Sequence, residues 1–153
     1  MNYFIKIERI PYEEPYHLQL VWDVSNGNIT SSFDFYVGTD ALKEIADTLE
    51  VFPRHASDVY LFEIGSEHPE DRFAYYFRFR VFTTDSRGHC AIQIRFNNNR
   101  DLPHKEITEF CIEAEAAGIN KLGNLFRAFS KLESELLLWS ETEQFIGGKY
   151  ENA

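Results

Sequence analysis

The side chains that could ligate a metal ion or act as a nucleophile are five histidines and two cysteines. Zinc sites need such residues a few positions apart, as in C-x-x-C or H-x-x-x-H, and neither spacing occurs in the sequence. His89 and Cys90 are adjacent, but neighbouring residues of a strand point to opposite faces and cannot act as a catalytic pair. Nucleophile-elbow, P-loop and dinucleotide-binding motifs are also absent. The sequence therefore predicts no metal site, no cofactor and no catalytic residue.

The elements that must position the remaining polar side chains follow from the spacing of apolar residues. Alternation predicts strands over 3–10, 17–24, 30–37, 58–64, 72–84, 89–97, 106–114 and 135–140. Helical spacing predicts helices from about 40 to 52 and from about 117 to 132. The order βββαββββαβ predicts one α+β domain over 1–153, with a single, mostly antiparallel sheet of seven or eight strands and both helices on one face. Residues 132–139 could instead extend the second helix, and 145–153 are expected to form a flexible tail.

Two segments, 33–62 and 110–139, show the same strand–helix–strand pattern 77 positions apart without a gap. In the helical positions, Ile45 and Leu49 of the first segment correspond to Leu122 and Phe126 of the second. Ala46 and Gly123 also correspond, and two small residues there predict a close backbone approach in each copy. We interpret the pattern as an internal duplication. The alternative is that amphipathic strand–helix–strand segments resemble each other by chance.

If both helices cover one face of the sheet, the opposite face carries an unusual mixture of tyrosine, arginine and acidic residues. Tyrosine and arginine are enriched in protein interfaces, which favours a partner-binding face. The alternative is a solvated face on which arginine and glutamate form cross-strand ion pairs, and such pairs are common in open sheets. The candidate partner-binding residues are Asp34, Tyr36, Tyr76, Arg78, Arg80, Gln93, Arg95, Glu109 and Glu113.

The net charge of −10 is concentrated in the first half of the chain. Residues 1–77 hold fourteen Asp and Glu against five Lys and Arg, whereas residues 78–153 hold eleven against ten. An acidic surface repels a phosphate backbone, so nucleic acid is excluded as a partner and a basic protein is favoured. No signal-peptide pattern and no apolar run of membrane-spanning length occur, which predicts a cytoplasmic protein with no membrane partner. We therefore expect Cys90 and Cys111 to be reduced thiols on opposite sides of the sheet.

The phrase Phe110-Cys111-Ile112-Glu113-Ala114-Glu115, leading into a helix that begins Gly118-Ile119-Asn120-Lys121-Leu122-Gly123, resembles small bacterial proteins of unknown function. Some of these are similar to the WapI-type immunity proteins, which neutralise secreted toxins. The resemblance covers most of the chain as a pattern, although the N-terminal hairpin region and the segment after Lys131 depart from it. It implies a stoichiometric inhibitor without catalytic residues, and it assigns a role to no individual residue.

These observations lead to three hypotheses. The first is a non-enzymatic cytosolic binding protein, in its sharpest form an immunity-like inhibitor of a basic protein partner. The alternative is a small enzyme or ligand-binding protein with a pocket between helices and sheet, which requires a cavity with convergent polar groups and a titratable residue of shifted pKa. The third is a homodimer formed through an open sheet edge or through Tyr36, Tyr76 and Arg78.

Overall fold

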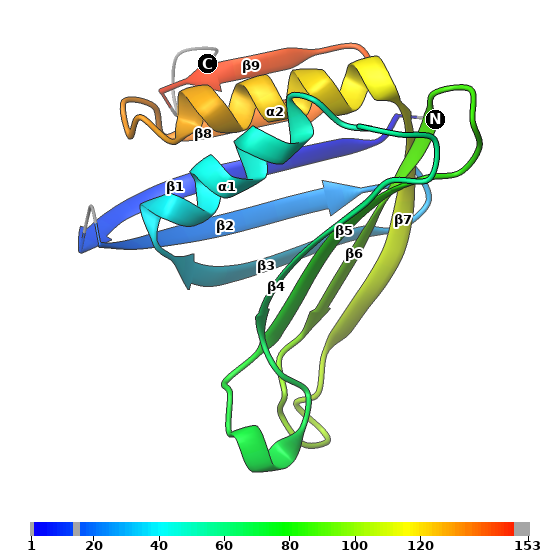
Figure 1. The fold of residues 1–153 in the computed structure, drawn as a ribbon. Helices are drawn as coiled ribbons and strands as arrows, with labels where there is room; N and C mark the ends of the chain where they lie inside the picture. The colour runs from blue at the N-terminus through cyan, green and yellow to red at the C-terminus, as the bar shows by residue number, and fades with distance from the viewer. Residues whose placement is uncertain (1, 14–15, 149–153) are drawn as a thin grey trace.

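The computed structural model describes residues 2–13 and 16–148 and shows an α+β fold, as predicted (Figure 1). Two helices, one 3₁₀ turn and nine strands occur within these residues. The helices are α1 (Thr39–Leu49) and α2 (Ala116–Phe129), and the 3₁₀ turn is η1 (Pro69–Asp71). The strands are β1 (Phe4–Glu13), β2 (His17–Ser25), β3 (Thr30–Val37), β4 (Val59–Gly65), β5 (Tyr76–Thr83), β6 (His89–Asn97), β7 (Ile107–Glu115), β8 (Leu136–Ser140) and β9 (Gln144–Gly147).

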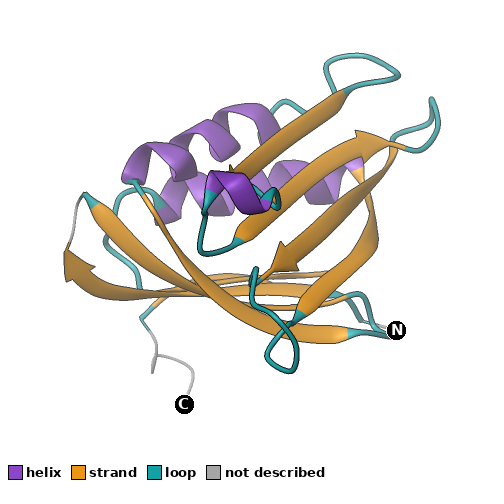
Figure 2. Cartoon of the chain, turned by 90° about the horizontal axis from the view of Figure 1, so that it is seen from below, coloured by secondary structure: helices purple, strands orange, loops and turns teal. Residues whose placement is uncertain are grey.

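The strands form two antiparallel sheets, so the prediction of one sheet with seven or eight strands was wrong. The five-stranded sheet has the order β3-β2-β1-β8-β9, and the four-stranded sheet has the order β4-β5-β6-β7. Both helices lie on one face of the five-stranded sheet (Figures 1 and 2). The error has a physical cause, because alternation identifies the two faces of a strand but not the strand that pairs with it.

The predicted repeat is present in the structure. The starts of β3 and β7, of α1 and α2, and of β4 and β8 are each 77 positions apart. The starts of β1 and β5, and of β2 and β6, are each 72 positions apart. Pairing follows the same rule, because Trp22 faces Ile7 and Phe33 while its counterpart Ile94 faces Phe79 and Phe110.

Each half of the chain therefore contributes a three-stranded meander, a helix and a strand that joins the other half's sheet. In the first half β1-β2-β3 is the meander, and β4 pairs with β5. In the second half β5-β6-β7 is the meander, and β8 pairs with β1. The strand β9 extends the five-stranded sheet beside β8, and no described strand takes the corresponding place beside β4. This arrangement gives the molecule an approximate internal twofold symmetry.

The core lies where the two sheets and the helices meet, and Trp22 of β2 is at its centre. The Trp22 ring lies 5.1 Å from the ring of Phe77 and 6.3 Å from the ring of Phe126, centroid to centroid. Along β5, Phe77 and Phe79 are fully buried in this core. Phe73 precedes β5 and is 53% exposed.

The helices cross at the small residues that the repeat aligns. Ala46 is fully buried, and a Cβ built on Gly123 would lie 2.5 Å from the backbone nitrogen of Glu50. The predicted burial of Ile45 and Leu49 in α1, and of Leu122 and Phe126 in α2, is confirmed. The amide of Asn120 donates hydrogen bonds to the carbonyl oxygens of Leu49 and Phe52, and these bonds complete the C-terminal end of α1.

The end of the chain differs in part from the prediction. Leu132 adopts a left-handed conformation with φ of 60°, which ends the helical segment and lets β8 form as the predicted strand. Residues 144–147, which lie at the start of the expected tail, form β9 and pair with β8. The rest of that tail, from 149 onward, lies outside the described residues. Within the described part of the chain, no helix is both long enough and apolar enough to cross a membrane.

Candidate functional site

The predicted partner-binding face is divided between the two sheets. Asp34 and Tyr36 lie on β3, on the exposed outer face of the five-stranded sheet, where Asp34 accepts a hydrogen bond from Gln19. The other seven candidates lie on the outer side of the four-stranded sheet: Tyr76, Arg78, Arg80, Gln93, Arg95, Glu109 and Glu113. The prediction of one continuous face was therefore wrong, because β3 pairs only with β2 and belongs to a different sheet from β5.

A single row of side chains crosses the four-stranded sheet in the order acid, base, base, acid. Cross-strand register places Glu63 beside Arg78, Arg78 beside Arg95, and Arg95 beside Glu109. Two arginines directly opposite each other repel, so this row needs additional negative charge. Glu67 supplies that charge from the loop after β4, through hydrogen bonds of 3.0 and 2.7 Å from the Arg95 guanidinium.

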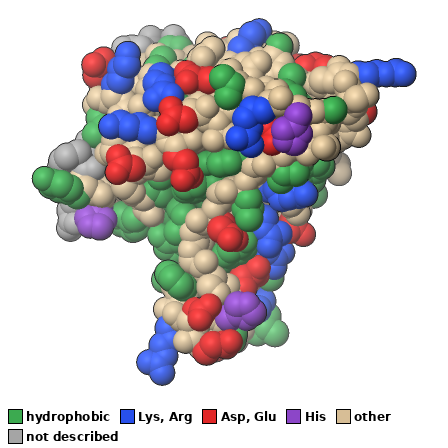
Figure 3. Space-filling view, viewed as in Figure 1, with side chains coloured by type: hydrophobic (Ala, Val, Ile, Leu, Met, Phe, Trp, Pro, Cys, Tyr) green, Lys and Arg blue, Asp and Glu red, His purple; other side chains and the backbone are tan. Residues whose placement is uncertain are grey.

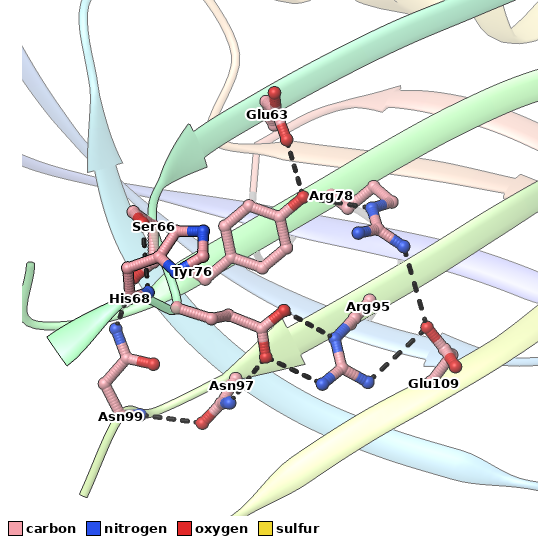
Figure 4. A network of polar contacts seen from close by, with 10 residues as sticks. Glu63, Ser66, His68, Tyr76, Arg78, Arg95, Asn97, Asn99 and Glu109 are labelled. Carbon is pink, nitrogen blue, oxygen red and sulfur yellow. Dashed lines mark hydrogen bonds and ion pairs between the residues drawn. The ribbon is translucent and has the colours of Figure 1, made fainter.

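The row belongs to a continuous network of polar contacts (Figure 4). The Tyr76 hydroxyl donates to Glu63 at 2.6 Å and accepts from Arg78 at 3.0 Å. The Arg95 guanidinium lies 3.5 Å from the Glu109 carboxylate. Arg95 hydrogen bonding lowers the pKa of Glu67 to about 2, while burial and the Glu63 carboxylate raise the pKa of Tyr76. The charges on this face thus neutralise one another, as the ion-pair interpretation predicts.

The remaining candidates on this sheet lie outside that row. Arg80 stacks on the ring of Phe82, with its guanidinium carbon 4.5 Å from the ring centroid. Gln93 lies between Arg80 and Cys111 in the cross-strand register. Glu113 lies near the end of β7 and lines a cavity that the sequence did not predict. The structure therefore does not unite the nine predicted residues in one site.

That cavity, called here the acidic pocket, has a volume of about 640 Å³. It forms where Tyr3, the β5–β6 turn, the start of α2 and the β8–β9 turn come together at one end of the molecule (Figure 1). Residues far apart in the sequence build it, so local spacing contains no signal for it. Among the described residues, its charged lining consists of four acidic and two basic side chains: Asp85, Glu113, Glu115, Glu141, His89 and Lys121.

His89 is held on both sides by carboxylates of the acidic pocket. Its Nδ1 lies 2.5 Å from Asp85, in the β5–β6 turn, and its Nε2 lies 3.3 Å from Glu115, which precedes α2. The hydrogen bond to Asp85, with the charges of both carboxylates, raises the pKa of His89. The same bond lowers the pKa of Asp85. With a carboxylate beside each ring nitrogen, the protonated form of the imidazole is favoured.

Two further groups that line the pocket, Tyr3 and Cys90, favour their neutral forms. Burial raises the pKa of Tyr3, and the nearby Glu141 and Glu115 raise it further. Burial, Glu115 and Asp85 raise the pKa of Cys90. The Cys90 side chain is buried and Cys111 is exposed, and both are free thiols, as predicted. A thiol of raised pKa is a weak nucleophile at neutral pH.

No group of three or more His, Cys, Asp or Glu side chains that could hold a metal ion occurs among the described residues. The acidic pocket therefore presents a cavity of mixed charge in which carboxylates outnumber cations four to two. Such a lining is complementary to a cationic group. No protein-family model, no curated protein and no solved structure matches this chain.

Proposed function

We propose that the protein is a non-enzymatic binding protein whose acidic pocket holds a basic side chain of a protein partner. The observation that carries this proposal is the composition of the pocket, in which four carboxylates line a cavity of about 640 Å³. The basic side chains among the described lining residues are His89 and Lys121, which offset part of this charge. A cavity of this size is large enough for a lysine or arginine side chain, and a deficit of positive charge attracts one.

The surrounding chemistry supports binding over catalysis. A carboxylate lies beside each ring nitrogen of His89, and burial raises the pKa of the Cys90 thiol. Neither group is in the state that a nucleophilic mechanism needs. The acidic first half of the chain adds long-range attraction for a basic surface.

An inhibitor of a basic toxin domain is the sharpest form of this proposal, and the acidic pocket is the surface where such an inhibitor would take an arginine or lysine. The outer face of the four-stranded sheet is a less suitable surface. Its Arg95 already has Glu67 and Glu109 as partners, so a binding partner would have to break those ion pairs.

A ligand-binding protein with a small cationic ligand is a second candidate. The acidic pocket lies between α2 and both sheets and contains titratable groups with shifted pKa values, which are the two features that hypothesis requires. The two candidates share the pocket and differ in the size of the bound molecule.

A titration with a fluorescent peptide of six arginines, and in parallel with free arginine amide, tests the proposal and separates the candidates. Replacing Glu113 and Glu141 together by Gln should weaken peptide binding about tenfold or more, because two of the four carboxylates that line the pocket are lost. The control replaces Glu63 and Glu70, which are outside the pocket, by Gln. Equal weakening by the two double variants would show that only net charge matters and would refute a specific pocket. Tighter binding of free arginine amide than of the peptide would favour the small-ligand candidate.

A further inference from the structure

We propose that β4 pairs with β4 of a second copy of this chain, so that two four-stranded sheets join into one antiparallel sheet of eight strands. The inference rests on the edge of the four-stranded sheet and does not depend on the acidic pocket. Its first support is the internal symmetry. The counterpart of β4 is β8, and β9 pairs along the outer side of β8, whereas no strand of residues 2–13 or 16–148 pairs along the outer side of β4.

Each of the other sheet edges within the described residues is either contacted by a side chain from another segment or short. Along β3, the Tyr75 hydroxyl accepts from the backbone nitrogen of Tyr36 at 3.2 Å and donates to its carbonyl oxygen at 3.4 Å. Along β7, the Asn26 amide donates to the carbonyl oxygen of Cys111 at 3.3 Å. The strand β9 has four residues, against seven in β4. A long uncovered edge is a template for strand pairing.

The register of β4 shows which backbone groups this edge presents. Thr83 donates its backbone N–H to the carbonyl oxygen of Asp58 at 3.2 Å, which makes Asp58 and Thr83 a hydrogen-bonded position of the ladder, while the Asp58 N–H itself donates to His55. Because hydrogen-bonded and non-bonded pairs alternate, Val59, Leu61 and Glu63 direct their N–H and C=O groups away from β5. The Asp58 carboxylate accepts a hydrogen bond from the backbone N–H of Val59. The backbone N–H and C=O groups of Leu61 and Glu63 therefore form the part of the edge that a second strand can bind.

A twofold axis at Leu61 matches these groups with their own copies. Leu61 then faces Leu61 of the second copy, and Val59 faces Glu63 in two equivalent pairs. On the inner side of the sheet, Tyr60 of each copy faces Phe62 of the other, which gives two equivalent pairs. Aromatic cross-strand pairs of this kind stabilise antiparallel sheets. No charged residue of β4 faces a like charge in this register, so the strand is complementary to itself.

The side chains of β4 are partly exposed, as expected for an edge strand, and pairing with a second strand would cover them. Val59 is 48% exposed and Leu61 is 49% exposed, and no residue of β4 is fully buried. Hydrophobic side chains reach the surface below the two helices, in the region that β4 crosses in the same view (Figures 1 and 3). Charged residues or a bulge would protect such an edge, and β4 carries only Glu63.

Sedimentation equilibrium of the whole chain gives the first test. We expect a monomer–dimer equilibrium that Leu61→Lys shifts to monomer, because two lysines would then face each other across the axis. Leu102→Lys is the matched control, since Leu102 is 81% exposed in a loop outside β4, and it should leave the equilibrium unchanged. A monomer at concentrations of several hundred micromolar, or a dimer that Leu61→Lys leaves intact, would overturn the proposal.

Oxidative cross-linking gives the second test, and it reports the register directly. In a Cys111→Ser background, which removes the exposed native thiol, Leu61→Cys should form a covalent dimer because the two positions face each other at a distance that a disulfide spans. Val59→Cys alone should not, because it faces Glu63. Val59→Cys combined with Glu63→Cys should cross-link again. Cross-linking of Val59→Cys alone with none at Leu61 would refute the twofold register.

Discussion

Gly123 of α2 lies against Leu49 of α1 so closely that a Cβ on Gly123 would be 2.7 Å from the Leu49 carbonyl carbon. Because backbone atoms are not free to move aside, Gly123→Ala should separate the helices and lower the free energy of unfolding by about 1–3 kcal/mol. Gly118→Ala in the same helix is the control, since its nearest neighbours would be 3.9 Å away. That substitution should raise stability by about 0.5–1 kcal/mol through helix propensity. Urea denaturation of the two variants measures the difference, and equal effects would contradict the close helix crossing.

The burial of the second helix gives a paired prediction. Leu122 is fully buried and its neighbour Lys121 is exposed. Leu122→Ala should therefore reduce the free energy of unfolding by about 2–5 kcal/mol, because the truncation leaves a cavity in the core. Lys121→Ala should change it by less than about 0.5 kcal/mol. Chemical denaturation of both variants decides the matter, and a small loss at Leu122 would show that α2 is not packed as described.

The bond between Glu67 and Arg95 predicts a specific dependence of stability on pH. The pKa of Glu67 falls from 4.5 to about 2 in the folded protein. The contribution of the ionised Glu67 to the free energy of unfolding is therefore fully present above pH 4.5 and is lost as the pH falls toward 2. Glu67→Gln should lower stability by up to about 1 kcal/mol at pH 7, because the pair is partly exposed, and by progressively less below pH 4. Glu70→Gln, in the exposed η1 turn, should have little effect at either pH. Denaturant titrations at several pH values compare them, and a loss that stays constant down to pH 2 would exclude the ion pair.

His89 gives a prediction for the acidic pocket. Its raised pKa means that the contacts to Asp85 and Glu115 are strongest below pH 6.5 and are lost as the pH rises through the pKa of the folded protein. NMR titration of the imidazole should find a pKa above 6.5. Asp85→Asn should lower that pKa toward 6.5, and by more than Glu115→Gln does, because the Asp85 hydrogen bond is the largest cause of the shift. A His89 pKa that neither substitution changes would contradict this geometry.

Deprotonation of His89 also leaves the acidic pocket with less positive charge. Basic peptides should therefore bind more tightly at pH 8 than at pH 6, and His89→Gln should remove most of that difference. The direction follows from the sign of the charge change alone. Fluorescence titration at the two pH values measures it, and weaker binding at pH 8 would contradict the acidic pocket as the binding surface.

Local features of the fold were predictable from the sequence because they depend on neighbouring residues. The spacing around Ile45 and Leu122 predicted both helices and their buried faces, and the 77-residue period predicted the repeat. The pairing of strands was not predictable in this way. Nothing within residues 30–37 indicates that β3 and β7 lie in different sheets, and the four residues of β9 are too few for a clear pattern.

The candidate sites show the same division. Strand alternation predicted that Arg78, Arg95 and Glu109 point to the outward side of their strands, whereas Glu63 was missed and the register that makes them neighbours comes from the structure. Glu67 was missed because it comes from a loop, and the acidic pocket was missed because four distant parts of the chain build it. Sequence patterns predict which side chains a strand exposes, whereas the residues that loops and chain ends place beside those side chains depend on the tertiary structure.

The exchange of β4 and β8 between the two halves has a consequence for folding. The pairing of β1 with β8 joins residues more than 120 positions apart, so it can form only after most of the chain has been synthesised. Until then the β1 edge is unpaired, and the first half cannot complete its sheet alone. We therefore expect folding to be slow and cooperative, with the two halves unable to act as independent folding units.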